Sequence, residues 1–394
     1  MHSIPAHKAA GILIAALVAS AAIVGCGSSS GSPASSSSPS TSAKGTPYAV
    51  GLIATLSGPL SGDFGGQSVG IDAWEKWTNA HGGVDGHPVK AYVMDDQSSP
   101  SAALQDVKTL ISQDHVLAIL GVSDEGPAWA PYAAQHGVPI IGGNTSIAPI
   151  PDWYPTGDVN LTYGAVAAAH KAGAKGIADV YCSEAALCAA SVPVIAHDAK
   201  TLGMTEPYAT GVALDQPGYT ATCLAARQHG ADALLEEVDL TTITTLAGDC
   251  AQQNYKPLYI GLAVEAGRPY LQGMPSGTTM AVAENVFPWF AHSSPATERY
   301  WQALETYEPG VFKSNNFGPS LAMAWASGEM FAAAAAHLGA HPTPAAVKAG
   351  LYSLKNETLG GLIPPTTYTP GKASVGSGYF IAVLKNGNYT APYG

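Results

Sequence analysis

The sequence predicts an α/β protein with two lobes, each built around a parallel β-sheet, and three observations lead to this prediction. Short apolar runs, such as Leu117–Leu120 and Val138–Ile141, end at a glycine and are followed by small polar residues. Segments with helical spacing separate these runs, and alternating strands and helices favour adjacent parallel strands. The alternation also continues far beyond one such unit, so we expect two α/β halves in succession.

The chain begins with a segment that we interpret as a secretory signal peptide. His7 and Lys8 precede an apolar run, Ala9–Val24, and small residues follow it, as is typical of such signals. The stretch Ile23–Cys26 resembles a bacterial lipobox, in which the cysteine is lipidated and becomes the first mature residue. A transmembrane anchor is the alternative, but the run is short for a bilayer span. We therefore expect Cys26 to carry a lipid.

The composition beyond this segment indicates an acidic, secreted protein. Residues 27–45 are almost all Ser, Gly, Pro, Thr and Ala, which favours a flexible tether rather than a packed core. The chain carries a net charge of −12 with only 17 basic residues, which argues against nucleic acid as a partner. We expect a monomer that faces the extracytoplasmic space and is attached to the cell membrane through its lipid anchor.

In the first half, each expected strand is an apolar run that ends in a turn, and each helix has one apolar face. Val69, Ala73 and Trp77 lie on one face of a helix that Asn79–Gly83 brings to an end. A proline near its start and a glycine just past its end mark the helix between the last two strands. The expected strands are Val50–Thr55, Val89–Met94, Leu117–Leu120 and Val138–Ile141, and the other helices are Gly65–His81 and Ala102–Gln113.

The second half repeats the same alternation and indicates a second Rossmann-like unit. Helical spacing at Tyr163–Ala172 precedes an apolar strand at Gly176–Tyr181. Further helices are expected at Ala189–Leu202, Thr220–His229 and Thr242–Gln253, with strands at Ala233–Glu237 and Leu258–Ile260.

Once Cys26 is set aside, an even number of cysteines is left, which favours disulfides in an oxidising compartment. Cys182 and Cys188 would close a short local loop. Cys223 and Cys250 each lie in a helical pattern, and neighbouring helices could bring them together. Other pairings are possible in principle, and a metal site is the rival interpretation. No C-x-x-C spacing or nearby histidine pair supports a metal, so we favour the bonds Cys182–Cys188 and Cys223–Cys250.

Three motifs in the first hundred residues resemble one known family. The turn Ser57–Pro59 follows the first strand, an N-A-x-G-G-x-x-G pattern at Asn79–Gly86 ends the first helix, and Asp95-Asp96 ends the second strand. These motifs occur in the order and at the spacing of the Leu/Ile/Val-binding branch of the type 1 periplasmic binding proteins. The resemblance extends in pattern to the end of the chain.

The resemblance implies two lobes joined by three crossover strands, with a solute held between the lobes and a hinge that lets them close. It divides the chain into a lipoprotein signal peptide at 1–26, a tether at 27–45, a first lobe at 46–158 plus 288–362, and a second lobe at 159–287 plus 363–394.

The resemblance also implies where the solute carboxylate would bind. The family uses a serine after one strand of the first lobe and small polar residues after the next, which correspond here to Ser123 and to the trio Asn144, Thr145 and Ser146. Loops at the carboxyl ends of parallel strands, beside a helix N-terminus, suit such a carboxylate. The alternative is that these residues only cap helices and turn the chain.

The second lobe departs from the pattern of family members that bind amino acids. Those proteins hold the amino group with a tyrosine and a glutamate, whereas here the corresponding loops contain rearranged acids, of which Asp239 and Glu265 are the candidate contacts. Acids at this place could bind an ammonium group, or they could be solvated loop charges. Trp129 could line an apolar part of the site, or it could pack in the core.

No catalytic, metal-binding or phosphate-binding motif points to an enzyme, and we expect no cofactor and no metal. The leading hypothesis is a lipid-anchored substrate-binding protein that delivers a small carboxylate, such as an apolar or branched-chain amino acid, to an ABC-type permease. The alternative is a sensory module of the same fold that signals to a membrane partner. A third hypothesis is a secreted enzyme or envelope protein that has kept the fold without solute binding.

Overall fold

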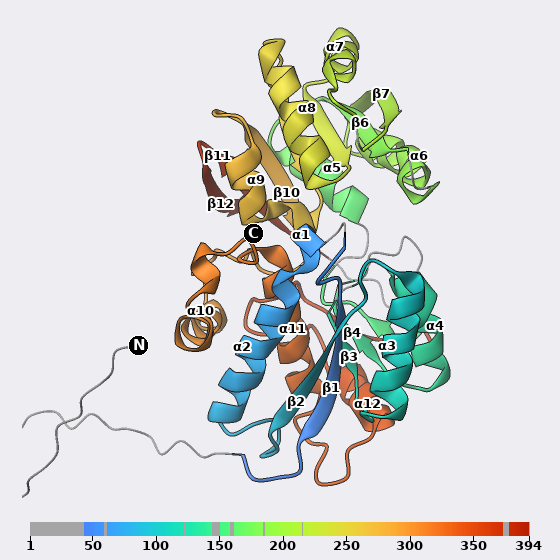
Figure 1. Ribbon diagram of the computed structural model, residues 1–394, viewed down its shortest axis with the longest axis vertical. Helices are drawn as coiled ribbons and strands as arrows, with labels where there is room; N and C mark the ends of the chain where they lie inside the picture. Colours follow the sequence, from blue (N-terminus) through green and yellow to red (C-terminus); the bar gives the residue numbers. More distant parts are fainter. Residues whose placement is uncertain are drawn as a thin grey trace, which may run out of the picture. The chain divides into compact units, whose positions relative to one another are not determined.

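The computed structural model describes residues 43–58, 61–121, 123, 125–143, 150–157, 161–183, 186–214, 216–372 and 378–393. These residues belong to one compact unit, Ser40–Gly394, which contains two β-sheets with helices on their faces (Figure 1). The α/β fold with two mostly parallel sheets is the one expected from the sequence. None of the helices in the described ranges is long and apolar enough to cross a membrane.

The first sheet has five strands in the order β2-β1-β3-β4-β5, and all neighbouring strands are parallel. Its strands are β1 (Tyr48–Ala54), β2 (Val89–Asp95), β3 (Ile119–Leu120), β4 (Ile140–Ile141) and β5 (Trp153–Tyr154). Helices connect β1 to β2, β2 to β3 and β3 to β4. The carboxyl ends of β1 to β4 therefore meet at one edge.

Side-chain alternation along β1 explains why helices cover both faces of the first sheet. Val50 and Leu52 belong to one core cluster, whereas Ile53 belongs to another on the opposite face. The first cluster includes residues of α2 (Gly66–Ala80), α10 (Pro295–Tyr307), α11 (Pro319–Ala334) and α12 (Pro344–Ser353). The second includes residues of α3 (Pro100–Ser112) and α4 (Gly126–Gln135).

Helices α2 and α11 lie side by side (Figure 1), and glycines allow their close approach. A Cβ atom added at Gly70 would come within 2.3 Å of the carbonyl oxygen of Leu321, and one at Gly328 would come within 2.3 Å of the Trp74 ring. Larger residues at these positions would separate the helices. Segments far apart in the chain thus build one core.

The second sheet has seven strands in the order β12-β11-β10-β9-β8-β6-β7. Its parallel part comprises β6 (Gly176–Cys182), β7 (Thr205–Val212), β8 (Ala233–Glu237), β9 (Leu258–Gly261) and β10 (Thr279–Glu284). The last two strands, β11 (Phe380–Lys385) and β12 (Asn388–Tyr393), pair in the antiparallel direction.

Helices cover both faces of the second sheet as well. Leu234 of β8 belongs to a cluster with α7 (Thr220–Gln228), α8 (Leu240–Gln252) and α9 (Arg268–Gly273). Its neighbour Leu235 belongs to a cluster with α5 (Leu161–Lys171) and α6 (Ala186–Thr201). The remaining short helices are α1 (Ser61–Phe64), η1 (Ala263–Ala266) and η2 (Val311–Lys313).

Both expected pairs of cysteines are bonded in the structure. Cys182 and Cys188 join the end of β6 to α6, with their Cα atoms 5.6 Å apart. Cys223 and Cys250 join α7 to α8, with their Cα atoms 5.1 Å apart. The second bond is completely buried, so it fixes two neighbouring helices over the second sheet.

The chain passes between the two sheets three times, and the three connecting segments lie against one another. The backbone N–H of Phe287 donates to the carbonyl of Leu362, and the hydroxyl of Tyr368 donates to the carbonyl of Pro155. Gly157 lies so close to Asn285 that an added Cβ would come within 1.9 Å of its carbonyl oxygen. These are the three crossovers that the family resemblance implies.

Strand β7 was not expected from the sequence. It lies at the edge of the second sheet, and most of its residues are exposed or partly exposed. Because an edge strand of this kind needs few apolar residues, it shows no apolar run that sequence patterns can detect. The segment that holds the Cys26 prediction lies outside the described residues.

Candidate functional site

Two acids at the end of β2 organise the loops at the carboxyl edge of the first sheet. Asp95 accepts hydrogen bonds from the backbone N–H groups of Leu56 and Ser57, at 2.9 and 3.1 Å, and from the Ser57 hydroxyl at 2.6 Å. Partial burial alone would raise its pKa, but these hydrogen bonds and one from Gln97 lower the pKa of Asp95 below its usual value. The lowered pKa favours the ionised form of Asp95, and its carboxylate fixes the turn after β1.

Asp96 links the ends of three strands of the first sheet. It is fully buried and accepts hydrogen bonds from the hydroxyl of Thr55 at 2.8 Å and from that of Ser123 at 2.7 Å. Thr55 follows β1, Asp96 follows β2 and Ser123 follows β3. In the sequence this acid is visible only as part of a family motif, whereas in the structure it connects three loops.

Ser123 is fully buried, and its hydroxyl group is already engaged. Its single hydroxyl hydrogen is donated to Asp96, and its oxygen accepts from the backbone N–H of Glu125 at 3.1 Å and from Trp129 Nε1 at 3.4 Å. The hydroxyl thus supports the loop between β3 and α4. The other predicted contacts on this side, Asn144, Thr145 and Ser146, lie outside the described residues.

Trp129 lies in the core rather than on a surface. It is 2% exposed, and its ring centroid lies 5.5 Å from that of Trp153 on β5. Trp153 also fits closely against the start of α4, because a Cβ atom added at Gly126 would come within 2.7 Å of its ring. Trp129 therefore packs in the core, which was the alternative to lining an apolar part of the solute site.

The two predicted acids of the second sheet both serve as helix caps. Asp239 is the N-cap of α8 and accepts from the backbone N–H of Thr242 at 2.7 Å. Glu265 lies in η1, is 4% exposed, and accepts from the backbone N–H of Leu262 at 2.6 Å. Each cap uses one carboxylate oxygen, which leaves the other oxygen for further contacts.

Five carboxyl groups gather where these caps meet the first sheet, and we call them the acidic group: Asp63, Glu236, Glu237, Asp239 and Glu265. Asp63, on α1, accepts a hydrogen bond at 3.2 Å from the hydroxyl of Tyr270, on α9. This bond joins a segment that follows the first strand of one sheet to a helix that covers the other sheet. The acidic group therefore lies where the two sheets approach each other.

Burial raises the pKa values of four members of the acidic group, Asp63, Glu236, Glu237 and Glu265. Burial, opposed by the Tyr270 hydrogen bond and assisted by Asp239, raises the pKa of Asp63 from 3.8 to about 6. Burial raises the pKa of Glu237 from 4.5 to about 7, against a hydrogen bond from Ser191. Burial also raises the pKa of Glu265 well above its ordinary value, and the neighbouring acids raise it further.

Glu236, like Asp63 and Glu237, is a member of the acidic group that the sequence patterns did not indicate as a ligand contact. It is fully buried, and neither carboxylate oxygen has a hydrogen-bond partner among the described residues. Burial raises its pKa well above the ordinary value. The sequence did contain a signal for the burial of Glu236, because side-chain alternation along β8 places position 236 on the same inward face as Leu234.

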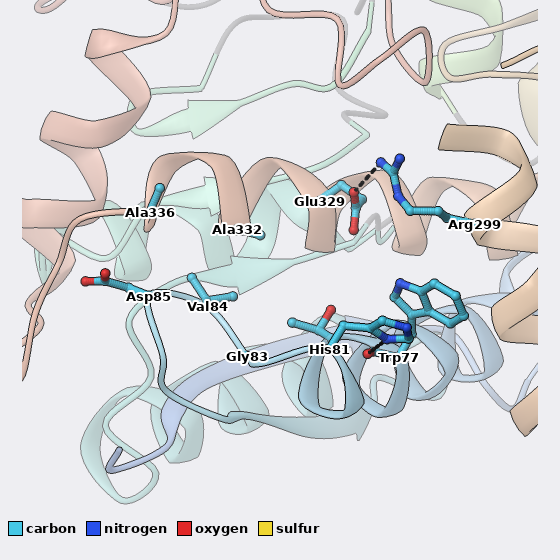
Figure 2. A pocket seen from close by; sticks show the side chains of 10 residues that line it. Trp77, His81, Gly83, Val84, Asp85, Arg299, Glu329, Ala332 and Ala336 are labelled. Atoms are coloured by element: carbon cyan, nitrogen blue, oxygen red, sulfur yellow. Dashed lines mark hydrogen bonds and ion pairs between the residues drawn. The ribbon is translucent and has the colours of Figure 1, made fainter. Parts of the chain in front are cut away.

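A pocket of about 400 Å³ lies at the opposite edge of the first sheet. Figure 2 shows the Arg299–Glu329 pair on one side of it, and Trp77 and His81 on the other. Asp85, which also lines it, precedes β2, so the pocket belongs to the amino-terminal edge. None of the predicted solute contacts lines it. The Glu329 carboxylate is already satisfied by Trp74 Nε1 at 3.1 Å and by Arg299 at 3.6 Å.

No group of three or more His, Cys, Asp or Glu side chains within the described ranges has the geometry to hold a metal ion.

A family model described as periplasmic binding protein matches residues 47–388 of the chain. The match covers the first sheet, the second sheet as far as the first residue of β12, and all three crossovers. Among curated protein sequences, none matches this chain.

Solved structures of solute-binding proteins share this fold over almost their whole length. A branched-chain amino acid ABC transporter protein from Thermus thermophilus, with bound valine, has a TM-score of 0.72 and 14% identity, with 89% of this chain and 96% of that chain covered. A solute-binding protein from R. palustris in complex with 4-hydroxybenzoate has a TM-score of 0.68 and 18% identity, with 88% and 95% covered. The branched-chain amino acid transporter substrate-binding protein from Streptococcus pneumoniae, in complex with isoleucine, has a TM-score of 0.68 and 16% identity, with 88% and 98% covered.

Proposed function

This chain belongs to the periplasmic binding protein family, and we propose that it is a lipid-anchored substrate-binding protein that delivers a small carboxylate to an ABC-type permease. The family match over residues 47–388 is the observation that carries the proposal. It includes both sheets, so the chain has the parts from which such receptors are built. Membrane attachment would occur through Cys26, at the start of the tether 27–45.

A carboxylate is the proposed common feature of the solute. Valine, isoleucine and 4-hydroxybenzoate, the solutes named for three structural neighbours, all carry one. An apolar or branched-chain amino acid is therefore a reasonable first probe. Because these neighbours are at most 18% identical to this chain, they support the fold and the class of experiment rather than one solute.

The proposed site lies between the lobes 46–158 plus 288–362 and 159–287 plus 363–394. The loops after β3 and β4 would hold the carboxylate through backbone N–H groups and through Asn144, Thr145 and Ser146. Because Ser123 donates its hydroxyl hydrogen to Asp96, it would support the loop after β3 rather than donate a hydrogen bond to the solute. Asp239 and Glu265 would face an amino group from the second lobe.

The test is a thermal-shift screen of the mature protein with amino acids, keto acids, aromatic acids and neutral polyols, followed by calorimetry on the best solutes. Thr145→Val should weaken carboxylate binding by about tenfold to a hundredfold, the effect of losing one charge-assisted hydrogen bond. Thr201→Val, a change at an exposed position on α6, is the matched control and should leave binding unchanged.

Stabilisation by neutral polyols alone would contradict the carboxylate proposal. Binding of a carboxylate by a protein that co-purifies with a membrane kinase rather than a permease would favour the sensory alternative.

A further inference from the structure

The acidic group has no basic partner among the residues that the structure describes. Within the described part of the chain, none of its carboxylates takes part in an ion pair. Arg268 is close in sequence to Glu265 and Tyr270, but its guanidinium donates to the carbonyl of Phe312. Buried acids without a cation are unfavourable in the charged form, so this place in the fold favours a positive charge from outside the chain.

The burial of Glu236 without a hydrogen-bond partner among the described residues is an independent observation that points to a ligand. Its side chain is 0% exposed, yet both oxygens lack a hydrogen-bond partner among the described residues. Strand alternation aims it at the face that Tyr259 and Tyr270 cover, and its charge acts on Glu265 and Tyr270. A fully buried and unpartnered carboxyl group is rare in folded proteins and calls for a specific compensation.

Gly261 lets Glu265 lie on that same face. A Cβ atom at position 261 would come within 2.8 Å of Glu265 Oε2, so any larger residue would displace the carboxylate. The Tyr270–Asp63 hydrogen bond then brings an acid from the first sheet's side to the same place. The acids thus approach one region from α1, β8, η1 and the start of α8.

The side chains present at this place favour an organic cation over a metal ion. A metal ion needs three or more ligands converging on one point, and no such group occurs within the described ranges. An organic cation is larger and can contact carboxylates that lie several ångströms apart. A single α-ammonium group would offset the charge of one carboxylate, whereas a solute with a second cationic group would offset two.

We propose that the solute is an amino acid with a positively charged side chain, of the lysine, ornithine or arginine class, whose cationic nitrogens bind against the acidic group. This inference rests on the proposed function and narrows its solute class, since the carboxylate end of the solute keeps the contacts proposed above. Asp63, Asp239 and Glu265 would contact the cation. Glu236 would stabilise the cation electrostatically, without contacting it.

Proton release is the signature of this arrangement. The titratable groups that face the site are Asp63 from α1, Glu236 from β8, Asp239 at α8, Glu265 from η1, Tyr259 from β9 and Tyr270 from α9, and Glu237 lies next to them on β8 but points to the opposite face, toward Ser191 of α6. The pKa values of Asp63 and Glu237 are raised to about 6 and about 7, so at about pH 7 roughly one tenth of Asp63 and about half of Glu237 hold a proton, and both fractions grow as the pH falls. A bound cation favours the charged form, so binding expels protons and tightens as the pH rises.

The first experiment compares L-lysine, L-ornithine and L-arginine with L-leucine, L-valine and 4-hydroxybenzoate by calorimetry, in two buffers of different ionisation enthalpy. We expect a basic amino acid to bind at least about tenfold more tightly than the others and to release protons. If leucine, valine or 4-hydroxybenzoate binds as tightly, the inference is overturned and the proposed receptor function stands. If no member of the panel binds, the inference and the proposed carboxylate function both fail.

The second experiment uses variants that keep the hydrogen-bond acceptors. Asp63→Asn can still accept from Tyr270, and Glu236→Gln removes a buried titratable carboxyl group that has no hydrogen-bond partner among the described residues. Each should weaken binding of the basic amino acid about tenfold or more and reduce proton release, while Glu305→Gln, at an exposed position on α10, should change neither. Unchanged affinity and proton release in Glu236→Gln would overturn the inference even if Asp63→Asn fails to fold.

Discussion

Replacing Asp179 by asparagine is expected to change how the stability of the protein depends on pH. Asp179 lies on β6, is fully buried, and has no hydrogen-bond partner for either carboxylate oxygen among the described residues. Burial, followed by the charges of Glu237 and Glu206, raises the pKa of Asp179 from 3.8 to about 8. The cause is local and electrostatic, so the isosteric neutral amide removes it.

The sign follows from proton linkage. Because the pKa is higher in the folded state, the folded protein holds a proton that the unfolded chain releases between the two pKa values. The stability contributed by this proton is fully present below pH 3.8 and is lost as the pH rises toward about 8. Each pH unit within that window lowers the free energy of unfolding by about 1.4 kcal/mol. Between about pH 5 and about pH 7 the wild type therefore loses about 3 kcal/mol through this residue.

The assay is urea denaturation of the wild type, Asp179→Asn and the exposed control Glu305→Gln at about pH 5 and about pH 7. The amide has its own cost of burial, but that cost is the same at both pH values and cancels in the comparison. We expect the variant to gain about 3 kcal/mol on the wild type between the two pH values, and the control to follow the wild type. Parallel loss of stability in wild type and Asp179→Asn would refute the reasoning.

Three further predictions concern the anchor, the buried disulfide and the strand-end loop. Cys26→Ser should release the protein from the membrane fraction, and a variant that stays bound would contradict the lipid anchor. Replacing both Cys223 and Cys250 by alanine should lower the free energy of unfolding by roughly 3.5 kcal/mol, because their bond closes a loop with a sequence separation of 27, and urea midpoints with and without reductant measure this. Ser123→Ala should lower the free energy of unfolding by about 1–3 kcal/mol in urea, because buried Asp96 loses a 2.7 Å hydrogen bond, and an unchanged urea midpoint would show that the loop does not depend on it.

Much of the fold follows from local patterns in the chain. The apolar runs that predict strands at 89–94, 117–120 and 176–181 lie within or overlap observed strands, because a buried parallel strand needs continuous apolar residues. Glycines and prolines at helix ends act within a few residues, so the helix between 120 and 138 is also visible in the sequence. Edge strand β7 escapes such patterns because its residues face solvent.

The chemistry of the candidate site depends on contacts between distant segments. Ser123 donates its only hydroxyl hydrogen to Asp96, an acid 27 positions away, and nothing in the residues next to Ser123 indicates this hydrogen bond. Asp63 and Tyr270 are separated by 207 positions and meet only because the three crossovers bring the two sheets together. By itself the sequence determined two successive α/β halves and the cysteine pairs, since patterning and spacing act locally. Tertiary structure alone decided which carboxyl groups are buried without a cation, because burial and repulsion depend on every element packed around a side chain.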